Sequence, residues 1–263
     1  MRKATKIGFI AVFCAAVGLT FPVFNIFSKQ LSMDSPEVLA QASAKLQILN
    51  DRLAENGCTL VLDLTPSKDR IYREYMPDGY PIVNEENRTD LLAGYLQSHT
   101  TVPVNWPYQE LRRQARLNPD RLLYYKTDTH WNSIGALYGL DGIFDALGLP
   151  ILQPGDYPVE PAGTTTGDMA NVAALYASLP PEQTYTVPGY ADLFAKDDRV
   201  VRVIGDSFSE YYMPYLEARF ATTWREHIDS FDPAVVEQPG CDILILEFNE
   251  RSLDKLLAIL DSI

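Results

Sequence analysis

The sequence has few of the residues that bind metal ions. Its 263 residues include three cysteines and three histidines, and neither His99 nor His227 has a cysteine or histidine at ligand spacing. Internal repeats are also missing. These absences exclude the usual zinc motifs and repeat architectures, and we expect neither a metal nor a cofactor.

Positive charge is scarce relative to negative charge. The chain holds 22 lysine and arginine residues against 35 aspartate and glutamate residues, a net charge of −13. Four of the basic residues precede residue 31, which leaves 18 basic against 35 acidic residues in the remainder, or −17. Nucleic acid and anionic membrane surfaces are therefore excluded as favoured partners.

Long apolar runs are absent after residue 27. Residues 7–27 carry no charge and are long enough to cross a bilayer. Three basic residues precede this run and Lys29 follows it, a bias that places the amino terminus in the cytoplasm and the bulk of the chain outside. No Ala-x-Ala-like site closes the run and Pro22 lies inside it, so we favour an uncleaved signal anchor at residues 1–30 over a cleaved signal peptide.

Residues 31–263 alternate short apolar runs with helical patterns, which predicts one α/β catalytic domain with a parallel sheet covered on both faces. Buried strands are predicted at 59–64, 200–204 and 241–246, an edge strand at 101–105 and a further strand at 222–224. Helices are predicted over 35–56, 89–98, 108–117, 133–147, 171–178, 210–220 and 253–263.

Residues 150–198 differ in texture from the rest of this domain. They hold many of the prolines and the stretch 164–167, Thr-Thr-Thr-Gly. We expect a loop-rich excursion from the sheet, because long connections of this kind are usually functional or disordered.

The stretch Lys126–Asn132 places an acid and a histidine two residues apart. In an extended segment Asp128 and His130 face the same way. Either the carboxylate orients the imidazole, or the imidazole acts alone as a general base. An isolated Asp-x-His is common and usually structural. A catalytic interpretation therefore needs a nucleophile elsewhere in the sequence.

Residues 203–208 provide such a nucleophile. A β-branched run ends in Gly205-Asp206-Ser207, which predicts a strand that leads into a tight turn and presents a serine. Serine catalysis needs a hydroxyl, a base and an orienting acid, in any chain order. We predict a triad of Ser207, His130 and Asp128, with the backbone N–H groups of the turn after Gly205, chiefly that of Ser207, stabilising the oxyanion.

In order and spacing, these motifs resemble the alginate O-acetyltransferase (AlgJ/AlgX-like) family of the SGNH hydrolase superfamily. The resemblance covers about residues 55–260. It is carried by Asp128-Thr129-His130-Trp131, by Gly205-Asp206-Ser207-Phe208, by Pro66-x-Lys68 with Tyr72 and Met76-Pro77, by Gly167-Asp168-Met169 and by Leu246-Glu247-Phe248-Asn249-Glu250-Arg251.

The resemblance implies a three-layer α/β/α fold of SGNH type with a circularly permuted block order. The strand before Ser207 would be the superfamily's first, 241–246 its third and 59–64 its fourth. Asn249 then stands where the superfamily has its oxyanion asparagine, although the related acetyltransferases do not generally require one. Glu250 and Arg251 fit the family better, as an ion pair that braces the site.

Other residues are candidates for binding substrate. Lys68 and Tyr72 follow a predicted strand end, where ligands gather in open sheets, or they are an ordinary loop lysine and a packed tyrosine. Trp131 either stacks on a sugar or packs in the core. Asp168 either lies near the active site or caps a helix.

The implied activity is an extracytoplasmic O-acetyltransferase, periplasmic or at the cell surface, that modifies a polysaccharide through an acetyl-serine. Its membrane attachment would be residues 7–27, and a membrane-bound O-acyltransferase would deliver the acetyl group. Two alternatives remain open. One is a carbohydrate esterase that uses the same triad with water as acceptor, and the other is a non-catalytic polysaccharide-binding or secretion module.

Cys58 and Cys241 each precede a predicted strand, 59–64 and 242–246. If the permuted order holds, these strands are parallel neighbours about 4.8 Å apart. The two cysteines would then meet at the amino-terminal end of the sheet, either as a disulfide or as two reduced thiols.

Overall fold

The computed structural model describes residues 35–77, 86–174 and 177–262. Its centre is a five-stranded sheet in the order β2-β1-β7-β5-β6, in which every neighbouring pair is parallel. The strands are β1 (Thr59–Thr65), β2 (Val104–Asn105), β5 (Asp197–Gly205), β6 (Phe220–His227) and β7 (Ile243–Asn249). The predicted parallel sheet is confirmed, and the edge strand predicted at 101–105 is present but shorter, since it begins only after Pro103.

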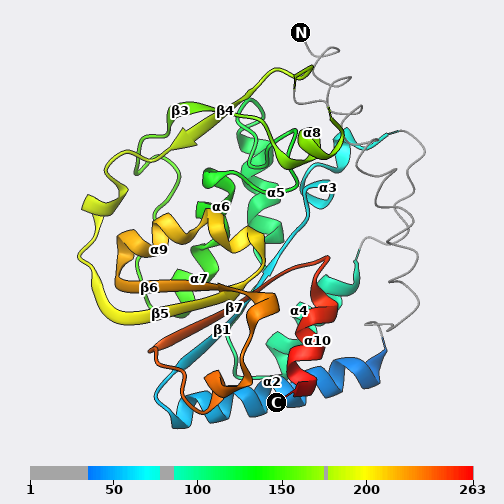
Figure 1. Ribbon diagram of the computed structural model, residues 1–263, viewed down its shortest axis with the longest axis vertical. Helices are drawn as coiled ribbons and strands as arrows, with labels where there is room; N and C mark the ends of the chain where they lie inside the picture. Colours follow the sequence, from blue (N-terminus) through cyan, green and yellow to red (C-terminus); the bar gives the residue numbers. More distant parts are fainter. Residues whose placement is uncertain (1–34, 78–85, 175–176, 263) are drawn as a thin grey trace.

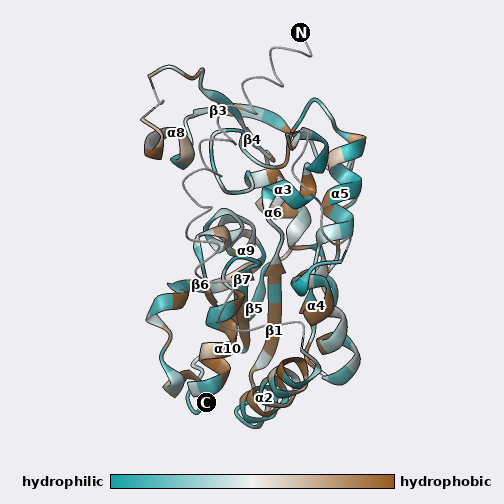
Figure 2. Cartoon of the chain, turned by 90° about the vertical axis from the view of Figure 1, so that its right-hand side faces the viewer, coloured by the Kyte–Doolittle hydropathy of each residue, from teal (hydrophilic) through white to brown (hydrophobic). Residues whose placement is uncertain are grey.

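Helices cover both faces of this sheet (Figure 1). One face carries α2 (Pro36–Glu55), α4 (Arg88–His99) and α10 (Leu253–Ser262). The other carries α5 (Tyr108–Leu117), α6 (Ser133–Gly139), α7 (Asp141–Ala146) and α9 (Met213–Arg219). Leu60 and Leu62 of β1 enter the first core and Val61 the second, so this strand is buried on both faces. Figure 2 shows the resulting hydrophobic character of β1. The predicted three layers are confirmed.

Strands β1 and β7 pair in parallel, with Thr59 opposite Ile243. The adjacency that was expected from the permuted order is therefore present. Cys58 and Cys241 meet at the amino-terminal end of these strands, with their sulfur atoms 3.6 Å apart. Both are free thiols in this structure. Of the two alternatives, a disulfide or two reduced thiols, the structure therefore shows the reduced thiols.

The internal structure of residues 150–198 differs from the prediction. It contains a separate antiparallel hairpin, β3 (Glu160–Thr165) and β4 (Glu182–Thr186), and a short helix α8 (Asp168–Val172) in place of the helix predicted at 171–178. The strand signal is hidden because β3 is mostly exposed and contains Pro161 and Gly163, two poor strand formers.

Two predicted helices are interrupted. The helix predicted at 133–147 divides at Leu140 into α6 and α7. The helix predicted at 210–220 is a 3₁₀ turn, Ser207–Tyr211, followed by α9. Pro214 lies in the first turn of α9, where its missing N–H costs no helical hydrogen bond, and this favours a helix start there.

The anchor predicted at residues 7–27 lies outside the described residues. Within the described ranges, no helix combines the length and the apolar character that a membrane crossing needs.

Candidate active site

Ser207 lies just beyond the carboxyl end of β5. Gly205 ends the strand, and Ser207 opens the 3₁₀ turn. Asp206 fixes this turn, because one carboxylate oxygen accepts the Phe208 N–H at 2.9 Å and the other accepts the Asn249 N–H at 3.0 Å. The nucleophile candidate is therefore held between two central strands of the sheet.

Glycine is required at position 205 by a close approach. A Cβ atom there would lie 2.7 Å from a carboxylate oxygen of Glu247 and 2.9 Å from the Ser209 hydroxyl. Glu247 in turn accepts the Asp206 N–H at 2.8 Å and the Thr65 hydroxyl at 2.9 Å. The turn thus rests directly on a buried carboxyl group.

Two carboxyl groups beneath the turn are completely buried, Asp63 on β1 and Glu247 on β7. Burial raises the pKa of Asp63 to about 8 and that of Glu247 well above its ordinary value, and the nearby Asp206 adds to both shifts. Asp63 accepts one hydrogen bond, from Asn105 at 2.7 Å. These two groups favour the neutral form near neutral pH.

His130 and Asp128 lie on the other side of the site, in an irregular segment of residues 125–130 that we call the catalytic loop. An isolated antiparallel bridge between Tyr124 and Trp131 closes this loop at its base. Immediately afterwards, Asn132 caps helix α6 by accepting two backbone N–H groups. The loop has fixed ends and no sheet ladder of its own.

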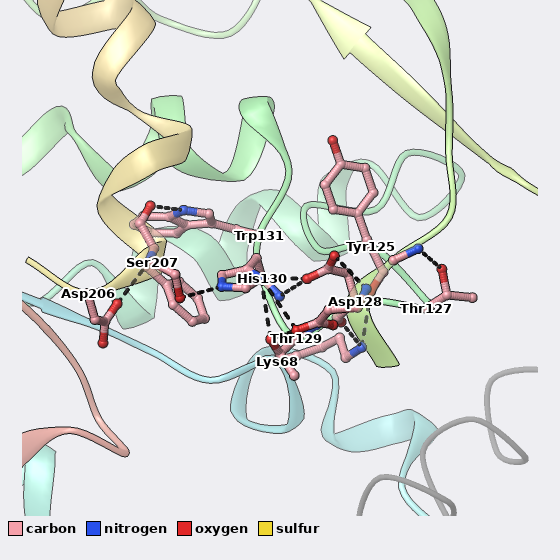
Figure 3. A network of polar contacts seen from close by, with 12 residues as sticks. Lys68, Tyr125, Thr127, Asp128, Thr129, His130, Trp131, Asp206 and Ser207 are labelled. Carbon is pink, nitrogen blue, oxygen red and sulfur yellow. Dashed lines mark hydrogen bonds and ion pairs between the residues drawn. The ribbon is translucent and has the colours of Figure 1, made fainter. Parts of the chain in front are cut away.

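Ser207, His130 and Asp128 form one hydrogen-bonded chain (Figure 3). His130 Nε2 lies 2.6 Å from Ser207 Oγ, and its Nδ1 lies 2.5 Å from Asp128 Oδ1. Burial acts to raise the pKa of Asp128, but hydrogen bonds from the His130 ring and from the backbone N–H groups of His130 and Asp168 outweigh it, so the pKa is lowered. The arrangement can deprotonate the serine hydroxyl and stabilise the resulting imidazolium.

Aromatic rings fix the plane of the imidazole. The His130 ring lies 4.9 Å from the Phe208 ring and 5.2 Å from the Tyr211 ring, which is nearly parallel to it at 25°. Both Ser207 and His130 remain half-buried, so neither is closed off completely from solvent.

Asp168 is the first residue of helix α8, and its carboxylate lies against the catalytic loop, near the active site. Its carboxylate accepts the Thr129 N–H at 2.9 Å and the Thr129 hydroxyl at 2.8 Å. Its own N–H donates to Asp128 at 3.0 Å. Asp128, His130 and Asp168 also form a group that is able to hold a metal ion, a cluster that sequence spacing did not predict.

Three of the predicted binding residues face inward. Trp131 is fully buried and its indole N–H donates to the Phe208 carbonyl at 2.9 Å, so packing and not sugar stacking is its role. Tyr72, 2% exposed, accepts the Leu123 N–H through its hydroxyl. Lys68, 6% exposed, directs its ammonium at carbonyl oxygens of the catalytic loop. None of the three presents a surface to a ligand.

Asn249 does not point its amide at the oxyanion position. It is 1% exposed, and its amide nitrogen donates to the Thr65 carbonyl at 3.0 Å. Its side-chain oxygen accepts from Arg251 Nε at 2.9 Å. Glu250 accepts the Ser67 N–H. The ion pair expected between Glu250 and Arg251 is therefore replaced by a bond from Ser67 to Glu250 and a bond from Arg251 to Asn249. Arg251 is exposed, so a substrate can contact it. Its guanidinium lies 5.7 Å from the Phe208 ring centre.

Glu182 was missed by sequence reasoning. It lies on β4 of the hairpin, and its carboxylate accepts the N–H groups of Lys126 and Thr127 at 2.5 and 2.6 Å. No local motif marks this residue. Its role follows only from the packing of the hairpin against the catalytic loop.

Comparison with known proteins gives consistent relatives. A family model described as the SGNH hydrolase-like domain of the acetyltransferase AlgX matches residues 27–223. The probable alginate O-acetylase AlgJ of Pseudomonas putida is 25% identical over 194 residues, which cover 66% of this chain and 49% of that protein. The chain spans about half the length of the curated relatives it matches.

Solved structures share the fold. The O-acetyltransferase domain of Pseudomonas putida AlgJ matches with a TM-score of 0.57 at 19% identity, covering 86% of this chain and 91% of that one. Bacillus cereus PatB1, solved with a sulfonyl adduct, matches with a TM-score of 0.58 at 15% identity, covering 83% and 91%. Since the family model spans well over half of the sequence, the chain belongs to the SGNH hydrolase-like family of AlgX-type acetyltransferases.

Proposed function

We propose that this protein is an O-acetyltransferase that modifies a polysaccharide through an acetyl group carried on Ser207. The observation that carries the proposal is the continuous chain from Ser207 Oγ through the His130 ring to the Asp128 carboxylate, with contacts of 2.6 and 2.5 Å. Family membership supports the reaction class, and the name of the Pseudomonas putida relative, an alginate O-acetylase, supports a polysaccharide acceptor.

In the first half-reaction, Ser207 Oγ attacks the carbonyl carbon of an acetyl donor. His130 Nε2 takes the hydroxyl proton, and Asp128 holds the imidazolium through Nδ1. The backbone N–H of Ser207 stabilises the tetrahedral oxyanion, since the Asn249 amide is engaged with Thr65. The intermediate collapses, the bond to the donor breaks, and His130 returns the proton to the leaving group.

In the second half-reaction, a sugar hydroxyl attacks the acetyl-serine. His130 removes the hydroxyl proton as the new ester bond forms and then returns it to Ser207 Oγ, so the enzyme is regenerated. Arg251 is the exposed candidate among the predicted binding residues to contact the acceptor.

The setting of this reaction is part of the same proposal. Residues 7–27 anchor the chain, the domain lies in the periplasm or at the cell surface, and a membrane-bound O-acyltransferase supplies the acetyl group. The permuted block order also belongs here, and it is supported by the adjacency of β7 to both β1 and β5.

The experiment is incubation of the purified full chain with an acetyl ester surrogate, with and without an oligosaccharide, followed by mass analysis of protein and sugar. Acetylated sugar is the expected product. Acetate alone would instead identify a carbohydrate esterase, since the half-buried Ser207 is also accessible to water. A protein that remains unmodified and inert would indicate a binding or secretion module.

A further inference from the structure

The catalytic loop, residues 125–130, belongs to no helix or strand. A loop packed inside a protein still needs partners for its backbone N–H and C=O groups, because an unpaired buried group is costly. Some of these partners are backbone groups, such as the Ala170 N–H on the Thr127 carbonyl. Others are charged side chains that come from three other elements, α3 (Lys68–Ile71), β4 and α8.

Lys68 donates hydrogen bonds to the backbone carbonyl groups of the catalytic loop. Its ammonium donates to the carbonyl oxygens of Asp128 at 2.6 Å, Tyr125 at 3.0 Å and Lys126 at 3.3 Å. Figure 3 shows this side chain rising to the loop beneath Asp128. An ammonium group has three rotatable donors on a flexible stem, which suits three carbonyls that point in different directions.

Glu182 accepts hydrogen bonds from backbone N–H groups of the catalytic loop, on the side opposite Lys68. Its carboxylate accepts the N–H groups of Lys126 and Thr127 and also the Thr127 hydroxyl. The same hydroxyl accepts the Gly167 N–H at 3.0 Å. A Cβ atom on Gly167 would lie 2.3 Å from the Thr127 carbonyl oxygen, so the excursion packs directly onto the loop.

We propose that Lys68 and Glu182 are positioning residues, an oppositely charged pair that holds the catalytic loop from two sides so that His130 meets Ser207. The inference rests on the proposed function, because it concerns the reactivity of the same triad. Neither residue touches the reacting atoms. Each acts through backbone groups of the segment that carries Asp128 and His130.

The charge of Lys68 gives this role a pH signature. Burial lowers the pKa of its ammonium to about 8, Glu182, Asp128 and Asp168 act against that shift, and Arg251 adds to it. As pH rises through about 8, the side chain loses its charge and one donor, so its hold on the loop weakens.

Stability moves in the opposite direction over the same range. The folded-state pKa lies below the ordinary value of 10.5, so the unfolded chain binds more protons between these two pH values. The contribution of Lys68 to folding stability therefore rises with pH from about 8 towards 10.5, whereas positioning by Lys68 declines. A purely structural lysine would not produce falling reactivity together with rising stability.

The test measures how fast phenylmethylsulfonyl fluoride modifies Ser207 in the full chain. The serine oxygen bonds to sulfur, fluoride leaves, and the serine proton passes through His130 to solvent. The reaction requires an activated serine and no polysaccharide. Failure to acetylate sugar therefore leaves this inference standing, whereas a wild-type protein that is not labelled at Ser207 would overturn both proposals.

The variants are Lys68→Met and Glu182→Gln, with Lys45→Met on α2 and the exposed Glu160→Gln on β3 as matched controls. We expect the labelling rate to fall on the order of 100-fold in both variants, since a displacement of about 1 Å costs that much, and to stay at the wild-type value in the controls. Glu182 lies outside the main sheet, so its variant decides the question if Lys68→Met does not fold.

Wild-type labelling rates in folded Glu182→Gln and, where it folds, in Lys68→Met would overturn the inference. A second readout is the pH profile of labelling. The decline above about pH 8 should disappear in Lys68→Met, and an unchanged decline would contradict the role of the lysine charge.

Discussion

The two halves of the site are held in place by different kinds of structure. Ser207 follows a central strand, and its turn rests on the parallel ladder and on the buried carboxyl group of Glu247, with the buried Asp63 nearby. His130 and Asp128 stand on a loop that has no ladder and is surrounded by Lys68, Glu182 and Asp168. The comparison teaches that one half depends on close packing and neutral acids, and the other on ionised side chains. The two halves should therefore respond differently to mutation and pH.

The largest effect is expected where the two halves meet. Ser207→Ala and His130→Ala should each lower turnover of an acetyl ester by on the order of 10⁴-fold or more, because the residues act as one unit. The double variant should be no slower than the slower single variant. Ester turnover measures this, with thermal unfolding as the control for the fold, and a double variant far slower than either single would contradict a shared role.

The amino-terminal end of the sheet offers a change that should strengthen the packed half without touching the catalytic loop. Hydrogen bonding with Cys58 lowers the pKa of Cys241, which favours Cys241 as the attacking thiolate. Oxidised glutathione should join the pair and raise the unfolding free energy by roughly 4 kcal/mol, less any strain. Ester turnover should stay constant.

A non-reducing peptide map and denaturant unfolding measure this outcome, with Cys58→Ser as the control. A failure of the cysteines to join would contradict the prediction, as would a loss of turnover on oxidation.

The neutral acids beneath Ser207 give the packed half its own pH dependence. The folded-state pKa of Asp63 is raised from 3.8 to about 8, so its contribution to stability is present below about pH 4 and is lost as pH rises through about 8. Asp63→Asn should remove this loss and make the protein more stable by a few kcal/mol at pH 8, with little difference at pH 4.

Thermal unfolding across this pH range measures the effect, and exposed Asp51→Asn on α2 is the matched control. An unchanged pH slope in Asp63→Asn would show that Asp63 is not the group responsible.

The smallest expected effect on stability concerns the close approach between Gly205 and Glu247. Gly205→Ala forces a Cβ atom against Glu247 and should cost about 1–3 kcal/mol of stability. Gly94→Ala in helix α4 meets no atom within 4 Å and should stabilise by about 0.5–1 kcal/mol. Equal responses of the two variants in denaturant unfolding would remove the argument for a glycine requirement at position 205.

The sequence predicted the packed half better than the loop half. Strands such as 59–64 and 241–246 consist mainly of apolar residues, and such segments are typical of a parallel sheet covered on both faces. Gly205-Asp206-Ser207 marks its own turn. The hairpin that carries Glu182 has no such signal, because it is mostly exposed and its contact with Thr127 joins residues 55 positions apart.

The candidate binding residues failed for a related reason. Lys68, Tyr72, Trp131 and Asn249 have polar atoms that suit ligands equally well as backbone groups. Which of these they contact depends on the direction of each side chain, and that direction is set by long-range packing. The motif stretches located these residues near the site but could not distinguish support from contact.

The central claim is that Ser207 carries the acetyl group, and peptide mapping of the full chain after brief exposure to an acetyl ester and acid quench tests it most directly. We predict one acetyl group, on the peptide that contains Ser207, lost when an oligosaccharide acceptor is added before the quench and absent from Ser207→Ala. An acetyl group on a different residue, or acetylated sugar produced by Ser207→Ala, would contradict the account.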